Sequence, residues 1–372
     1  MAELPLVEPQ RIGLDPARLQ RAYDLLVRWT DSGELPAAAL CVGRREGLVA
    51  PRVFGRRSPG GREAAAPDAL FLLASITKPV TATAVMLLVE RGRLTLDDRV
   101  ADHIPAFAHN GKADVRLRHL LTHTSGLPDM TPSNDRLRAE HRPLEAFLEE
   151  VCGLPLLFPP GSQVRYQSMG FAMLAEVVHQ AAGTVLRDFL KRELFEPLGM
   201  TDTSLGWREE TRDRICTVRV SPAQEKTDWN WNTPYWLGFG APWGGLISTP
   251  ADLSRLCRML LGLGTLDGKR VLGPATVRAM TSNQLATMSL VPEVERRCRP
   301  WGLGWRLAWP GQSENFGDLV GSKAFGHWGA TGTLVWVDPE ADLFCILLTT
   351  QPQGDEGHYL ARVSNIVAAA AS

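Results

Sequence analysis

The 372-residue chain is almost electrically neutral, with 40 basic and 41 acidic residues and a formal net charge of -1 at pH 7. This balance gives no electrostatic reason to expect nucleic acid or an anionic membrane surface as a partner. The hydrophobic content of 44% and the charged content of 22% are those of a soluble globular protein with a sizeable core. Small molecules are therefore the expected partners.

Cysteine usage and the N-terminus bear on the cellular compartment. The 6 cysteines are scattered without any Cys-x-x-Cys pair, which favours reduced and mostly buried thiols. Residues 1–10 contain neither a basic patch nor an apolar core, so we expect no signal peptide. No apolar run reaches the ~18 residues that a membrane-spanning helix needs. We therefore expect a cytoplasmic protein that does not contact membranes.

The first predicted elements are a helix and a pair of strands. Asp15 followed by Pro16 is typical of a helix start, and the apolar spacing after it predicts a helix to about Trp29. Segments 37–42 and 48–54 are apolar and are separated by a turn, which predicts two strands.

The middle of the chain is predicted to be helical, and strands return near its end. Helices and long loops are expected from Ser75 to about Gly240, and Thr249 with Pro250 predicts the start of another helix. Four further strands and a closing helix are predicted over 302–309, 324–328, 331–338, 343–350 and 356–370. Strands at both ends with helices between them favour one sheet assembled from the two termini, with a helical lobe inserted.

A candidate nucleophile lies at the start of the inserted lobe. A helix beginning near Ser75 would place Ser75 and Lys78 one turn apart on the same face, so that a hydroxyl and an amine can meet. Only 6 of the 40 basic residues are lysines, so a site that needed mere positive charge would more often have an arginine. Lysine can act as a base when burial lowers its pKa, whereas arginine cannot. A purely structural helix start would nevertheless have much the same sequence.

Two more stretches contain titratable side chains in loop or glycine-rich contexts. Tyr166 precedes the helix predicted over 171–182, and its phenol could relay a proton if neighbouring cations lower its pKa. His327 lies in an exposed-looking strand bracketed by Gly326 and Gly329, where a ligand or another backbone could approach closely. Taken singly, the tyrosine is more typical of packing, and the histidine is typical of a surface position or of a histidine whose hydrogen bonds are satisfied.

The three stretches Ser75-Ile-Thr-Lys78, Tyr166-Gln-Ser168 and His327-Trp-Gly329, in this order, resemble the active-site elements of the serine beta-lactamase-related hydrolases. This family includes class C beta-lactamases, D-alanyl-D-alanine carboxypeptidases and family VIII carboxylesterases. Further similar stretches lie at 120–128, 196–203, 244–253 and 302–305, so that the resemblance covers roughly residues 10–365.

The resemblance implies an α/β (α+β) fold of the beta-lactamase/transpeptidase type, in which helices flank an antiparallel sheet built from both termini. We expect a single unit over 1–372, with a sheet lobe formed by 1–74 and 246–372 and a mostly helical lobe formed by 75–245. The resemblance requires no metal or organic cofactor, and it leaves the oligomeric state open.

The resemblance also assigns roles to residues. Ser75 would be acylated, Lys78 would accept its proton, and Tyr166 would share that proton and protonate the leaving group. The backbone N–H groups of Ser75 and Ala330 would form the oxyanion hole.

Two departures from the family pattern concern the substrate. Ser168 stands where the second element usually has asparagine, and its shorter side chain would reach less far. His327, Trp328 and Gly329 replace Lys-Thr-Gly in the third element, and the substrate-binding permanent cation of that lysine is lost because an unperturbed histidine is largely neutral at pH 7. Both changes favour neutral esters over anionic peptides.

Two other stretches stand out in the sequence pattern: one is aromatic and one contains a histidine. The aromatic stretch 229–243, with Trp236 and Trp243, is predicted either to line the substrate pocket or to pack a long loop. His123 is predicted to belong to a structural turn with no catalytic role. No Gly-x-Ser-x-Gly motif occurs, which argues against an α/β-hydrolase.

The sequence therefore predicts a carboxylesterase that cleaves a small-molecule ester through a seryl acyl-enzyme. The alternatives are a beta-lactamase or D-amino-acid peptidase with the same chemistry, an acyltransferase, and a binding or sensor module that has lost turnover.

Overall fold

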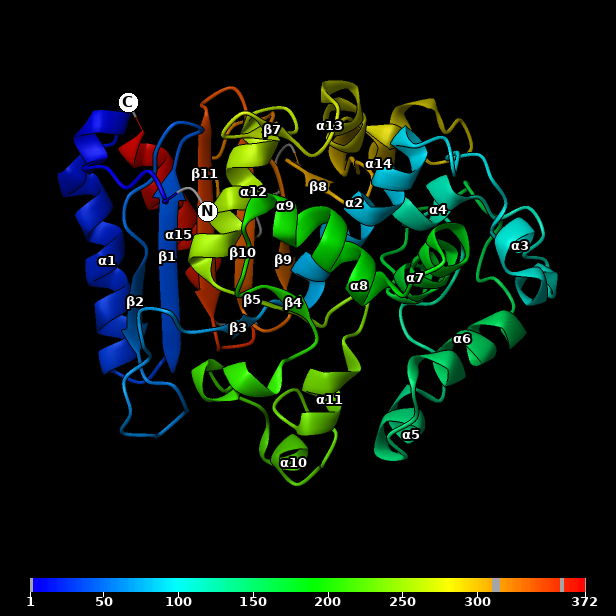
Figure 1. Ribbon diagram of the computed structural model, residues 1–372, viewed down its shortest axis with the longest axis horizontal. Helices are drawn as coiled ribbons and strands as arrows, with labels where there is room; N and C mark the ends of the chain where they lie inside the picture. Colours follow the sequence, from blue (N-terminus) through cyan, green and yellow to red (C-terminus); the bar gives the residue numbers. More distant parts are fainter. Residues whose placement is uncertain (1–2, 310–314, 355–357, 372) are drawn as a thin grey trace.

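The computed structural model describes residues 3–309, 315–354 and 358–371, and it is built around one antiparallel sheet (Figure 1). The strand order is β2-β1-β11-β10-β9-β8. The strands are β1 (Ala37–Gly43), β2 (Arg52–Gly55), β8 (Arg306–Leu307), β9 (Phe325–Gly329), β10 (Thr333–Asp338) and β11 (Leu343–Thr349). The first two come from the N-terminal part of the chain and the other four from the C-terminal part, which confirms the predicted sheet from both termini.

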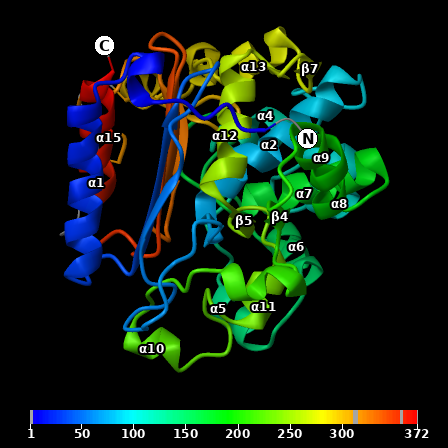
Figure 2. The ribbon, with the colours of Figure 1, turned by 60° about the vertical axis from the view of Figure 1, so that its left-hand side comes forward.

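Both faces of this sheet are covered, because most side chains of its central strands are apolar on both faces. Along β1 and β11 every residue is buried, and successive side chains enter two different hydrophobic clusters. Helices α1 (Pro16–Asp31) and α15 (Tyr359–Ala370) lie together on one face (Figure 2). Helix α12 (Pro250–Leu261) and the helical lobe cover the other face.

Local signals in the sequence define where two of these helices start. The Asp15 carboxylate accepts hydrogen bonds from two N–H groups in the first turn of α1, and Pro16 occupies the first helical position. The Thr249 hydroxyl accepts the Asp252 N–H at the start of α12, again with a proline at the first position. Both predicted helix starts are confirmed.

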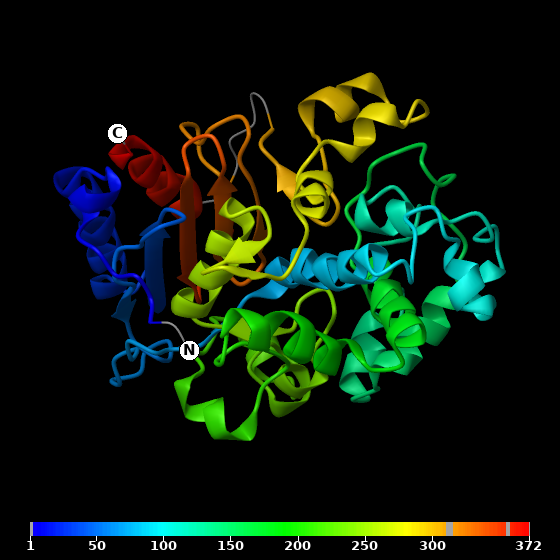
Figure 3. The same ribbon diagram turned by 45° about the horizontal axis from the view of Figure 1, so that its top comes forward.

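Helix α2 (Thr77–Glu90) runs through the middle of the molecule, between the sheet and the other helices (Figure 3). It is buried at every position from Thr77 to Leu88, as its nearly continuous apolar sequence predicts. The remaining α-helices are α3 (Val100–His103), α4 (Leu117–Leu121), α5 (Asn134–Ala139), α6 (Leu144–Gly153), α7 (Met169–Ala182), α8 (Leu186–Leu190), α9 (Glu196–Leu198), α10 (Pro222–Glu225), α11 (Pro234–Phe239), α13 (Pro274–Met280) and α14 (Glu293–Cys298).

Several boundaries differ from the prediction. The second strand begins only at Arg52, because the chain from Leu48 makes an isolated bridge to Gly43 before it joins the sheet. The strand predicted over 302–309 is reduced to β8, two residues at the sheet edge. The start predicted for the closing helix near Glu356 lies outside the described residues.

A second, three-stranded sheet brings together three segments that are distant in the sequence. Its order is β3 (Phe71–Leu72), β5 (Leu246–Ser248), β4 (Ser204–Leu205), whereas β6 (Thr265–Leu266) and β7 (Lys269–Arg270) form a separate hairpin. The Leu73 N–H, directly after β3, donates to the Leu246 carbonyl at 2.8 Å.

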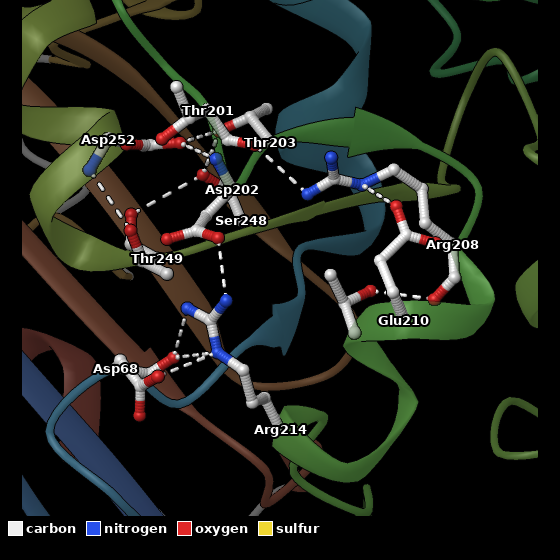
Figure 4. Close-up of polar contacts among 11 residues, drawn as sticks. Asp68, Thr201, Asp202, Thr203, Arg208, Glu210, Arg214, Ser248, Thr249 and Asp252 are labelled. Atoms are coloured by element: carbon white, nitrogen blue, oxygen red, sulfur yellow. Dashed lines mark hydrogen bonds and ion pairs between the residues drawn. The ribbon is translucent and has the colours of Figure 1, made fainter.

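A polar network ties the outer side of this small sheet to α12 (Figure 4). The Thr203 hydroxyl donates to the Asp252 carboxylate at 2.8 Å and lies 2.7 Å from the Ser248 hydroxyl. Arg214 pairs with Asp202 at 2.6 Å and with Asp68 at 2.8 Å. Two of the stretches that carry the family resemblance, 196–203 and 244–253, thus meet in a network that supports the fold.

The cysteines and the longest helices are two further features of the structure. All 6 cysteines are free, and Cys41, Cys216, Cys257 and Cys345 are buried. Across the described residues no single helix could cross a membrane by length and composition, and only the bent pair Met169–Ala182 with Leu186–Leu198 passes that test.

Candidate active site

Ser75 lies on a sharp turn between β3 and α2. Ala74 has φ 48°, a left-handed conformation that is uncommon for a residue with a Cβ atom. A short 3-10 turn, Ala74–Ile76, follows and leads into α2. Ser75 is partly exposed, whereas both of its neighbours are buried. The turn therefore presents the hydroxyl at the surface of the buried helix start.

Lys78 reaches back to this hydroxyl, as the spacing predicts. The ammonium donates to Ser75 Oγ at 3.1 Å and to the Trp243 carbonyl at 3.1 Å. The side chain is fully buried, and this burial lowers the lysine pKa to about 7, although the charge of Asp129 works in the opposite direction. A substantial fraction of Lys78 is therefore neutral near pH 7 and can accept a proton from Ser75.

Tyr166 approaches the same pair from the segment before α7. The Lys78 Nζ lies 4.6 Å from the centre of the Tyr166 ring. Burial raises the pKa of the phenol above its ordinary value of 10, and the Ser75 side chain opposes this shift. The condition set from the sequence, that neighbouring cations lower this pKa, is not met, because burial is the stronger effect. The phenol keeps its proton at neutral pH and can donate it.

The third element lies beside Ser75 because β9 ends in glycine. A Cβ atom on Gly329 would lie 2.2 Å from the Leu73 carbonyl oxygen, so only glycine allows this approach. The Thr331 hydroxyl donates to the Leu72 carbonyl at 2.7 Å, and the Thr333 hydroxyl donates to the Leu73 carbonyl at 2.9 Å. These contacts fix the exposed residue Ala330 next to the turn that carries Ser75. The predicted oxyanion donors thus come from two segments that are hydrogen-bonded together.

His327 is buried, and not on an exposed strand as its glycine-rich context suggested. Its side chain is 1% exposed, and Nδ1 lies 2.7 Å from the Trp328 carbonyl. Since a carbonyl only accepts, Nδ1 carries the proton and Nε2 has the free lone pair. Burial and the charge of Lys78 lower the pKa of this histidine to about 3. His327 is therefore a neutral hydrogen-bond acceptor at pH 7, and Nε2 has no hydrogen-bond partner within the described residues.

Trp328 points to the other face of β9, because side chains alternate along a strand. It pairs with Leu334 in the cluster covered by α1 and α15, and its ring lies 3.7 Å from the Arg306 guanidinium carbon. The geometry gives no support to the predicted contact between the Trp328 side chain and the substrate.

Ser168 contacts a carboxylate and not the lysine. Its hydroxyl donates to Asp129 Oδ1 at 2.7 Å, and its N–H donates to the Asp129 carbonyl at 3.1 Å. Asp129 itself is exposed, whereas Ser168 is 5% exposed. The shorter side chain thus fixes the loop before α5 to the start of α7, and its predicted contact with the substrate stays a prediction.

The aromatic stretch forms a packed cluster behind Lys78. The ring centres of Trp236 and Trp243 are 6.5 Å apart, and both rings contact Phe239. The two indoles are 4% and 5% exposed. The Trp243 carbonyl is the part of this stretch that touches the catalytic pair. Pocket lining by the two indole side chains stays a prediction.

Residues that were given no role in the site from the sequence also surround it. His123 and Trp301 lie against Tyr166, with ring centres 4.6 Å and 6.0 Å from the phenol ring. The residues around His123 are typical of a turn, so the sequence did not indicate that its ring lies at the site. The only indication was that His123 belongs to one of the stretches that resemble the family. Among the described residues, no group of three or more His, Cys, Asp or Glu side chains is arranged to hold a metal ion.

Comparison with known proteins assigns this arrangement to a family. The Beta-lactamase family model matches residues 21–369. The chain belongs to the Beta-lactamase family. The chain is thus a serine hydrolase of the beta-lactamase fold, and the catalytic roles of the serine-lysine pair, the tyrosine and the β9 element stay predictions.

The proteins to which the chain is similar have names that state different activities or none. The chain is 30% identical over 353 residues to Protein Rv1367c of Mycobacterium tuberculosis, with 86% of each chain covered. It is 30% identical over 349 residues to Penicillin-binding protein 4 of Amycolatopsis lactamdurans, with 90% of this chain and 85% of that protein covered. The crystal structure of a family VIII carboxylesterase shares the fold, with a TM-score of 0.76 and 20% sequence identity. The match covers 95% of this chain and 98% of that one.

Proposed function

We propose that this member of the Beta-lactamase family hydrolyses neutral carboxylic esters through a seryl acyl-enzyme. The observation that carries the proposal is the state of His327. The family's beta-lactamases and peptidases have a lysine here, whereas this chain presents an uncharged ring with a free lone pair at Nε2. A carboxylate on the substrate would therefore meet no cation from this element.

Acylation follows from the contacts of Ser75. The neutral fraction of Lys78 accepts the hydroxyl proton as Ser75 Oγ bonds to the ester carbonyl carbon. The carbonyl oxygen becomes an oxyanion, for which the N–H groups of Ser75 and Ala330 are the proposed donors. The C–O bond to the alcohol then breaks, and the departing oxygen takes the phenolic proton of Tyr166, which Lys78 restores.

Deacylation uses the same groups in reverse. Water attacks the acyl carbonyl and gives a proton to the base formed by Lys78 and Tyr166, and the bond to Ser75 Oγ breaks as that oxygen regains a proton. The products are a carboxylic acid and an alcohol, and the enzyme returns to its starting state.

Steady-state kinetics with p-nitrophenyl butyrate and nitrocefin test the proposal. We expect turnover of the ester that is lost in Ser75→Ala and in Lys78→Ala, with little turnover of the anionic beta-lactam. Thr95→Ala is a matched control, because this exposed residue bonds through its hydroxyl to Asp98 and not to the site. Ester turnover that persists in Ser75→Ala would refute the proposal.

Peptide or beta-lactam hydrolysis is the second candidate, because Penicillin-binding protein 4 is a relative at 30% identity over most of both chains. Nitrocefin turnover with a kcat/KM equal to or above that for the ester would favour this candidate. Product analysis with a competing alcohol would separate hydrolysis from acyl transfer.

A further inference from the structure

His123 is buried directly against the proposed proton donor. Its side chain is 0% exposed, and its ring centre lies 4.6 Å from that of Tyr166 at an angle of 31°. Trp301 packs on it nearly edge-on, with ring centres 4.3 Å apart. The histidine therefore forms part of the surface on which the Tyr166 ring rests.

Two hydrogen bonds attach His123 to the residues on either side of Tyr166. Its carbonyl accepts the Arg165 N–H at 2.9 Å, and its Nδ1 accepts the Gln167 N–H at 3.2 Å. The Gln167 side chain is fixed in turn, because Ser125 Oγ donates to its Oε1 at 3.0 Å. The backbone before and after Tyr166 is thus held by a single residue from another loop.

The conformation of His123 suits this task. Its φ of 61° is left-handed, which histidine and asparagine adopt more readily than most residues with a side chain. Because Nδ1 accepts from a backbone N–H, the ring proton of the neutral form is on Nε2. Burial, Lys78 and His327 hold the pKa of His123 well below its ordinary range, so Nδ1 remains an acceptor at neutral pH.

We propose that His123 is a positioning residue that holds Tyr166 in place for proton transfer. The inference rests on the proposed function, because it assumes that Tyr166 donates a proton to the leaving group. Its essential group is the Nδ1 acceptor, since the backbone hydrogen bond to Arg165 remains whatever the side chain is.

A matched pair of variants isolates this acceptor. Asparagine places an oxygen on Cγ, as histidine places Nδ1, whereas leucine has the same branching with no acceptor. We expect His123→Asn to keep kcat for p-nitrophenyl butyrate within about 5-fold, whereas His123→Leu loses about 10²-fold with little change in KM. Thermal unfolding and the control Thr124→Val, which removes a buried hydroxyl contact with Thr122 in the same loop, account for any general loss of stability.

A double-mutant cycle with Tyr166→Phe decides whether His123 acts through the phenol. If it does, His123→Leu lowers kcat in the native background and has little further effect once the phenol is absent. A loss of equal size in both backgrounds, or equal kcat values for the asparagine and leucine variants, would overturn the inference. Unchanged turnover in Tyr166→Phe alone would instead contradict the mechanism in the proposed function.

Discussion

The lowered pKa of Lys78 makes a direct prediction about the pH dependence of ester hydrolysis. At the ordinary lysine value of 10.5, only about 3 molecules in 10,000 would be neutral at pH 7, whereas at about 7 roughly half are. Burial thus raises the fraction of molecules in which Lys78 is neutral by about 10³-fold. This shift corresponds to a free-energy cost of roughly 5 kcal/mol for the charged form of the lysine. We expect kcat/KM to rise with pH along a limb whose apparent pKa is near 7.

The same limb distinguishes Lys78 from the two histidines near it. His327 has a pKa of about 3, and that of His123 lies well below its ordinary range, so neither histidine titrates near neutrality. The charge of Asp129 raises the Lys78 pKa, and the variant Asp129→Asn should therefore move the limb to lower pH. Lys78→Arg should be inactive across the range, because arginine does not lose its proton.

Initial rates of p-nitrophenyl butyrate hydrolysis between pH 5 and 9, corrected for the spontaneous reaction, measure this limb. The reasoning about Lys78 would be refuted by a limb that stays in place in Asp129→Asn or shifts to higher pH. Activity that is independent of pH across 6 to 8 would refute it equally.

Three further predictions concern other parts of the molecule. The variant Gly329→Ala should lose about 1–3 kcal/mol of stability and most ester turnover, because the new Cβ would lie 2.2 Å from the Leu73 carbonyl oxygen. The control Gly153→Ala places a Cβ where no atom lies within 4 Å, so it should unfold no earlier than the native protein. Asp252 has a pKa raised from 3.8 to about 6 by burial, so the folded state binds its proton more tightly and native stability should fall by up to roughly 3 kcal/mol as pH rises from 4 to above 6. Asp252→Asn should lack this contribution, so the melting temperature of the variant minus that of the native protein should increase as pH rises from 4 to above 6. A difference that stays constant or decreases would contradict the assignment. His327→Lys should raise the ratio of nitrocefin to ester turnover about 10-fold or more, because it restores a cation at the third element; an unchanged ratio would show that His327 does not select substrate charge.

The sequence was most informative where a local rule decides the structure. The caps at Asp15 and Thr249 and the all-round apolar helix after Ser75 could be read directly, because capping and burial patterns are local. The serine-lysine contact could also be predicted, since residues three apart on a helix share a face.

Properties that depend on three-dimensional surroundings could not be predicted in this way. The rise in the Tyr166 pKa and the burial of His327 result from segments distant in sequence that enclose both rings. The opposite orientation of Trp328 follows from strand register, which its flanking glycines do not reveal. His123 sits in a tight turn, and only the folded chain brings that turn against the segment around Tyr166.

Trapping the acyl-enzyme tests the central claim most directly. Rapid acid quenching during turnover of p-nitrophenyl butyrate, followed by mass spectrometry of the intact chain and its peptides, locates the covalent intermediate. The account predicts one added butyryl group on the peptide that contains Ser75, and none in Ser75→Ala. A butyryl group on another residue, or ester turnover in Ser75→Ala at the native rate, would contradict it.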